Sequence, residues 1–140
     1  MRDIKSNNKA KTVAIWVLGV ALGLVFLAAG GTKVLGMAPH PANFARWGFS
    51  PAVMYAVGVY EVLGAALLFY PRSTSVGALL LIGNMIGAVM TRLHSHEARE
   101  AIPPIVLMAL LSIVGYERRG YLQGMVRRPP EEATTEDRRA

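Results

Sequence analysis

The sequence predicts an all-α integral membrane protein, folded as an antiparallel bundle of four transmembrane helices, and three observations support this. Hydrophobic residues make up 53% of the 140 residues and charged residues only 17%, whereas about a quarter of the residues in a soluble domain are charged. The apolar residues gather in four runs with short polar segments between them. Most basic residues lie in the two terminal tails, beside these runs.

The composition also excludes several classes of function. The net charge of +6 does not indicate a nucleic-acid partner, because the cations do not alternate with aromatic residues and the positive-inside rule explains their place in the tails. The chain has no cysteine, which excludes disulfides, thiolate metal sites and iron–sulfur clusters. A redox role would therefore need a bound cofactor or a partner protein.

The first span is expected at about residues 13–35, after a basic cytoplasmic tail of residues 1–12. A basic start followed by an apolar run also describes a secretory signal peptide. The run from Val13 to Gly31 is longer than the apolar region of a usual signal peptide, and further spans follow it. We therefore expect an uncleaved first helix.

Residues 36–50 predict a short loop at the membrane–water interface. Prolines, glycines and polar side chains in this segment indicate an irregular backbone. Phe44, Trp47 and Phe49 carry rings that suit the interface. The same three residues are candidates for contact with a membrane or redox protein partner.

The second and third spans are expected at about residues 51–70 and 74–93. Pro51 suits the first turn of a helix, where its missing N–H costs nothing, and Pro71 ends the run that follows. Because almost no loop separates the two runs, their helices must be antiparallel neighbours.

The fourth span, at about residues 101–116, is the shortest. Residues 117–140 are rich in charge and proline, and we expect a cytoplasmic tail that is partly disordered. Eleven of the fifteen Lys and Arg residues lie in the two tails and at the Arg72 turn. The positive-inside rule then places both termini in the cytoplasm, for a multi-pass protein of the bacterial inner membrane.

Small residues spaced i, i+4 allow membrane helices to approach each other closely. Gly19 and Gly23 have this spacing, as do Gly83 and Gly87. We expect close helix packing at both pairs, with no dedicated dimerisation motif.

Glu61 is the residue that is most costly to place in lipid, since it lies near the middle of the second span. Gly58, Glu61 and Ala65 share one helical face, which predicts that the carboxylate points between packed helices. Asn84 lies at a similar depth in the antiparallel third span. The sequence therefore predicts a central contact between Glu61 and Asn84.

Lys33 lies near the outer end of the first span, roughly 10 Å above Glu61 by helical rise. A direct ion pair would need an offset helix or the long lysine stem, so we expect Thr91 and His94 as nearer neighbours. Structural roles remain open, with Lys33 reaching the headgroups and Glu61 holding helix register. The functional interpretation is one outward-opening ligand pocket lined by Lys33, Tyr60, Glu61, Asn84, Thr91 and His94.

The sequence also offers weaker signals for two other ligands, a metal ion and a quinone. His94 and His96 with Glu97 could hold a metal, but a loop without a second ligand cluster is a weak signal. Aromatic and methionine side chains could wall a site for a flat apolar cofactor such as a quinone, although ordinary packing also explains them. These side chains are Met54, Tyr55, Tyr60, Met85 and Met90.

Four stretches carry a resemblance to a known family: GGTKVLG, NFARWGF, VGVYEVLGAALLFYPRST and GALLLIGNMIGAVMTRL, in this order. The order resembles the DoxX-like family of small bacterial membrane proteins, over residues 25–116. The resemblance implies a four-helix bundle. It also carries the family pattern onto Lys33, Glu61, Pro71, Arg72 and Thr91.

The resemblance implies several roles and does not choose among them. Relatives called DoxX or DoxD are associated with membrane redox complexes, including thiosulfate oxidation with quinone as acceptor, while others act as receptor-assembly chaperones. The first hypothesis is an accessory component of membrane redox metabolism that binds a small apolar or quinone-like ligand. The alternatives are an assembly factor without a ligand and a proton-coupled transporter, and autonomous catalysis is not expected.

Overall fold

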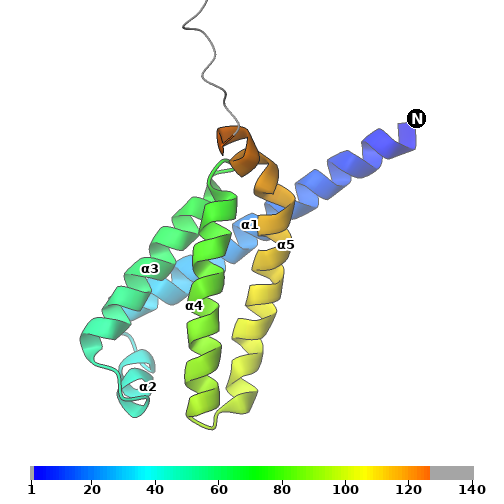
Figure 1. The fold of residues 1–140 in the computed structure, drawn as a ribbon. Coiled ribbons are helices and arrows are strands. Elements are labelled where there is room, and N and C mark those ends of the chain that lie inside the picture. Colours follow the sequence, from blue (N-terminus) through cyan, green and yellow to red (C-terminus); the bar gives the residue numbers. More distant parts are fainter. Residues whose placement is uncertain (1, 127–140) are drawn as a thin grey trace, which may run out of the picture.

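The computed structural model describes residues 2–126, and this part of the chain is helical and contains no strand. Five α-helices and one short 3-10 helix follow each other along the chain (Figure 1). They are α1 (Arg2–Val34), α2 (His40–Arg46), α3 (Pro51–Phe69), α4 (Thr74–His94), η1 (Ala98–Ala101) and α5 (Ile102–Val126).

Four of these helices, α1, α3, α4 and α5, are long and apolar enough to cross a membrane. Only 22–33% of the most apolar part of each is buried inside the chain. The remaining apolar surface must face lipid, because exposure of so much apolar surface to water is unfavourable. The prediction of an all-helical, four-span membrane protein is confirmed.

Proline sets two of the helix boundaries. Ser50 is extended and Pro51 opens α3, as the fixed φ angle and absent N–H of proline favour. The turn at Pro71 joins α3 to α4 directly, so these two helices run antiparallel. The helices also extend past two of the expected spans, since α1 begins at Arg2 and α5 continues to Val126. The expected disorder of residues 127–140 lies outside the described residues.

The bundle is held by a core at the level where all four spans meet. Its buried members come from α1, α3, α4 and α5 and include Phe26, Ala65, Leu81 and Leu111. In Figure 1, α3, α4 and α5 run side by side and α1 crosses them obliquely. The N-terminal part of α1 projects beyond the bundle, at the end opposite to α2 and η1.

Close helix packing occurs at the predicted Gly23 and also at glycines that the spacing did not predict. A Cβ atom on Gly30 would lie 2.7 Å from the carbonyl oxygen of Gly58, and one on Gly77 would lie 2.8 Å from that of Gly64. Gly23 also packs closely, against the ring of Phe69.

The expectation of close packing at Gly83 and Gly87 is wrong. Nothing lies within 4 Å of a Cβ atom placed on either residue. Both glycines line an open space between α4 and its neighbours. The reason is that α3 and α4 touch near their connecting turn, at Gly64 and Gly77, and leave a gap further along α4.

Candidate functional site

A cavity of about 840 Å³ lies in the half of the bundle that carries α2 and η1. Residues of all five α-helices line it. Gly83 and Gly87 form a wall without side chains on α4, and Phe26 and Phe44 contribute rings from α1 and α2. The cavity is therefore largely apolar, with its polar groups confined to a few positions.

The main polar group of the cavity wall is a cluster of three side chains from three helices. Nζ of Lys33 on α1 lies 2.8 Å from Oε2 of Glu61 on α3. Nδ2 of Asn84 on α4 donates to the other carboxylate oxygen over 2.9 Å. Glu61 is only 3% exposed, so these two partners compensate a carboxylate that water hardly reaches.

The predicted contact between Glu61 and Asn84 is therefore present. Gly58 and Ala65, which share the face of Glu61, are buried with it. The small residues allow the neighbouring helices to come close, and the carboxylate points between them as the sequence indicated.

The direct ion pair of Lys33 with Glu61, which we expected to need an offset helix or the long lysine stem, is present. Gly30 lies one turn before Lys33 and Gly58 lies one turn before Glu61, and their backbones touch where α1 crosses α3. A depth estimate from parallel, straight helices fails at such an oblique, close crossing. Lys33 also donates to the carbonyl oxygen of Ala29 over 3.4 Å.

Thr91 and His94 are not the partners of Lys33 that we expected. Thr91 does line the cavity, but its hydroxyl donates to the carbonyl oxygen of Gly87 over 2.9 Å. His94 is exposed at the end of α4 and does not line the cavity. Lys33 instead forms its ion pair with Glu61. His94, in the last turn of α4, lies at the surface and away from the cavity.

His40 takes the place that the sequence suggested for His94. It lines the cavity at the start of α2, and its Nε2 lies 3.0 Å from Oγ1 of Thr32. That hydroxyl also lies 3.0 Å from the carbonyl oxygens of Ala28 and Ala29. Since a carbonyl only accepts, the contacts agree when the hydroxyl donates to a carbonyl and Nε2–H of His40 donates to the hydroxyl.

Burial lowers the pKa of His40 below its ordinary value of 6.5, and the positive charge of Lys33 lowers it further, while Glu61 acts in the opposite direction. His40 is therefore neutral at pH 7. The sequence offered no signal for this residue, because a histidine beside prolines in a loop has no periodicity that would place it on a cavity wall.

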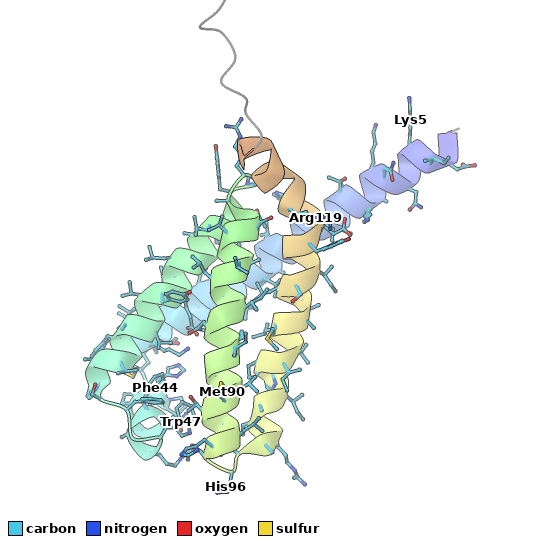
Figure 2. All side chains as sticks on the ribbon, viewed as in Figure 1. Lys5, Phe44, Trp47, Met90, His96 and Arg119 are labelled. Atoms are coloured by element: carbon cyan, nitrogen blue, oxygen red, sulfur yellow. The ribbon has the colours of Figure 1, made fainter. Side chains whose placement is uncertain are left out.

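Tyr60 lines the cavity and links two helices, since its hydroxyl donates to the carbonyl oxygen of Leu80 over 3.1 Å. Among the side chains considered as walls for a flat cofactor, Met85 also lines the cavity, whereas Met54, Tyr55 and Met90 do not. Met90, labelled on α4 in Figure 2, is 66% exposed.

The aromatic residues of the predicted interfacial loop pack on one another at the cavity. Phe44 is buried, and its ring centroid lies 5.4 Å from that of Trp47 and 6.1 Å from that of Phe49. All three line the cavity. Figure 2 shows Phe44 and Trp47 between α2 and α4. Their role toward lipid or a partner protein stays a prediction.

Within residues 2–126, no three acidic or histidine side chains lie close enough together to hold a metal ion. His94 and His96, the weak candidates, are both exposed. His96 lies at the tip of the turn after α4 (Figure 2).

Comparison with known proteins agrees with the fold. The model of the DoxX-like family matches residues 17–114. Over 84 residues the chain is 27% identical to a protein of Bacillus subtilis (strain 168) named "Putative oxidoreductase CatD". The aligned region covers 60% of this chain and 63% of CatD, so the chain spans less than two thirds of this relative. No solved structure matches the chain.

Proposed function

The chain belongs to the DoxX-like family, and from this membership and its cavity we propose that it is an accessory component of membrane redox metabolism that binds a small apolar or quinone-like molecule. The observation that carries the proposal is an apolar cavity with one buried polar cluster in its wall. Ligand sites in proteins combine these two features, since the apolar walls supply affinity and the few polar groups orient the ligand.

The size of the cavity supports a ligand larger than water. Pockets for small molecules typically enclose about 300–1,000 Å³, and the cavity of about 840 Å³ falls in the upper part of this range. A ring system with part of an apolar tail would fit such a volume. The side-chain-free wall at Gly83 and Gly87 leaves room for a flat ring against α4.

Hydrogen-bonding groups remain on the cluster for a ligand. An ammonium has three N–H donors, and Nζ of Lys33 has two acceptors, Glu61 and Ala29. The carboxylate of Glu61 only accepts, so the amide nitrogen of Asn84 must face it. The amide oxygen of Asn84 and its second N–H are then available to a carbonyl or hydroxyl group.

Charge compensation favours an uncharged head group. Lys33 and Glu61 form an ion pair, and Arg92, the other cation that lines the cavity, pairs with Glu100 over 3.0 Å. His40 is neutral. A carboxylate, phosphate or quaternary ammonium would add a charge without a partner in a poorly hydrated site, at a cost that a quinone carbonyl avoids.

The link to redox metabolism rests on the family and on the name of CatD, which describes an oxidoreductase. This chain has no cysteine. Any electron transfer that involves it therefore passes through a bound molecule or a partner protein, which makes an accessory role more consistent with these residues than autonomous catalysis.

The proposal places the protein in the bacterial plasma membrane with both termini in the cytoplasm. Eleven of the fifteen basic residues then lie on the cytoplasmic side, as the positive-inside rule requires. The half of the bundle that holds the cavity, at the end opposite to the N-terminus of α1, then lies toward the outer face of the membrane.

Mass spectrometry of organic extracts from the purified protein tests the proposal. Gly87→Leu would place a side chain in the cavity from a position where nothing lies within 4 Å of the new Cβ atom. Gly31→Leu is the matched control, because Gly31 has the same free space but does not line the cavity. Glu61→Leu removes the polar cluster.

We expect a stoichiometric quinone or similar molecule in the unchanged protein and in Gly31→Leu, and its loss in Gly87→Leu and in Glu61→Leu. Bulk lipid alone in all four samples would overturn the proposal and favour an assembly role, with Glu61 as a packing residue. A small molecule that survives Gly87→Leu would lie outside this cavity, and that result would also contradict the proposal.

A further inference from the structure

The cavity separates two pairs of helices, and α2 and η1 belong to different pairs. α2 is the connection between α1 and α3, whose backbones touch at Gly30 and Gly58. η1 lies in the connection between α4 and α5. Both connections lie at the same end of the bundle (Figure 1). Side-chain contacts join the two pairs of helices at that end of the cavity.

Four side chains make these contacts, Arg92 from the last turn of α4 and the others from the two connections, and we call them the mouth latch: Arg46, Trp47, Arg92 and Glu97. One carboxylate oxygen of Glu97 lies 2.6 Å from a guanidinium nitrogen of Arg46. The other accepts from Nε1–H of Trp47 over 3.2 Å. The guanidinium of Arg92 lies 5.3 Å from the centroid of the Trp47 ring, within the range of a cation–π contact.

We propose that the mouth latch controls access to the cavity, and that Glu97 and Trp47 are its central positioning residues. Glu97 binds two side chains of the opposite connection with its two oxygens. Trp47 and Arg92 both line the cavity, so loss of these contacts frees parts of its wall. The inference rests on the proposed function and deepens it, because a ligand must enter the cavity either past the mouth latch or from the lipid-facing side of the bundle.

The latch differs from the central cluster in exposure, and this difference makes it reversible. The side chain of Arg46 is 58% exposed and that of Glu97 is 20% exposed, whereas the side chain of Glu61 is 4% exposed. Ion pairs in contact with water are weak and screened by salt. The latch therefore opens readily while the bundle stays joined at Glu61.

Glu100 provides a matched comparison within the same connection. It pairs with Arg92 at the end of α4, so this contact stays within one pair of helices and does not reach α2. Removing Glu100 deletes a carboxylate of similar position and leaves Glu97 bound to Arg46 and Trp47. Glu97→Ala and Glu100→Ala thus change the same loop with different expected effects on the cavity.

Thiol labelling of the full chain tests the latch without any knowledge of the ligand. The sequence has no cysteine, so Ala88→Cys, on the cavity wall, introduces a single thiol. Its rate of reaction with a water-soluble maleimide is measured alone and together with Glu97→Ala, Trp47→Phe or Glu100→Ala. A thiol at exposed Ser6, outside the cavity, reports the intrinsic reactivity.

We expect Glu97→Ala to raise the labelling rate at position 88 several-fold and Trp47→Phe to raise it less. Glu100→Ala leaves Glu97 bound to Arg46 and Trp47 and should leave the rate nearly unchanged. High salt should raise the rate in the unchanged latch and have little effect after Glu97→Ala. Equal rates in the Glu97→Ala and Glu100→Ala backgrounds would overturn the inference. Thermal denaturation and gel filtration show whether each variant keeps its fold.

The result is separable from that of the ligand experiment. If labelling follows Glu97 but extracts contain only bulk lipid, the latch stands and the proposed function fails. If extracts contain a stoichiometric small molecule but Glu97→Ala does not change the labelling rate, the proposed function stands. The ligand must then enter from the lipid-facing side of the bundle.

Discussion

The ammonium of Lys33 lies 2.8 Å from Oε2 of Glu61, although 28 residues separate the two along the chain. The other oxygen of this carboxylate accepts from Asn84, so one side chain of α3 joins α1 and α4. Such a contact stabilises the bundle only while all its partners are present, because an isolated charge in this environment is costly.

Removal of one member of the Lys33–Glu61 pair should destabilise the protein more than removal of both. A buried charge left without its partner costs about 3–5 kcal/mol, whereas replacement of a whole pair by apolar side chains is often close to neutral. We expect Lys33→Met and Glu61→Leu each to lower the melting temperature in detergent, and the double variant to recover part of the loss. Additive losses in the double variant would show that the two residues do not interact.

Gly30→Ala should disrupt the crossing of α1 and α3, and Gly31→Ala should not. The new methyl group would lie 2.7 Å from the carbonyl oxygen of Gly58 in the first variant and would meet nothing within 4 Å in the second. Overpacking of this kind costs about 1–3 kcal/mol, while alanine in an open helix position gains about 0.5–1 kcal/mol over glycine. Equal melting temperatures would contradict the close crossing.

Acidification should lower the stability of the folded protein, because it favours protonation of His40 at the start of α2. Because burial and Lys33 lower the pKa of His40 below 6.5, the unfolded chain binds a proton more readily than the folded one. Stability is therefore complete above pH 6.5 and is lost as the pH falls through the window between 6.5 and the lower folded value. We expect His40→Gln to reduce this loss in thermal denaturation, with His94→Gln, at an exposed position, as the control. An unchanged pH dependence in His40→Gln would exclude this residue as its source.

The orientation can be tested with single thiols at the two ends of the bundle. Ser95→Cys lies in the connection after α4, and Ser6→Cys lies in the projecting part of α1. In intact cells, a reagent that cannot cross the membrane should label position 95 and spare position 6. Labelling of position 6 alone would place the termini outside and reverse the assignment from the basic residues.

The membrane spans were largely predictable from the sequence, because the causes of these helices are local. A backbone in lipid has to satisfy its polar groups within its own segment, so each long apolar run becomes a helix. Prolines then mark the ends of a run, as Pro51 and Pro71 do around α3. The positions of Glu61 and Asn84 along two antiparallel, neighbouring spans were sufficient to predict their contact.

The shape of the site was decided by tertiary structure. Hydropathy and residue spacing do not predict that α1 crosses the bundle obliquely. This crossing, with Gly30 in contact with Gly58, brings Lys33 next to Glu61. The same spacing rule that indicates packing at Gly83 and Gly87 cannot tell a helix contact from a cavity wall. A glycine allows close approach, and only the positions of the other helices determine whether anything approaches.

The sequence by itself thus determined the fold class, the four spans and the central carboxylate with its amide partner, since lipid imposes these on each segment separately. Tertiary structure alone decided the ion pair of Lys33, the place of His40 on the cavity wall, the exposure of His94 and the contact of Trp47 with Glu97. These features depend on the angles at which helices cross and on how two distant connections meet. Such relations are set by the fit of several helices at once, which no single segment specifies.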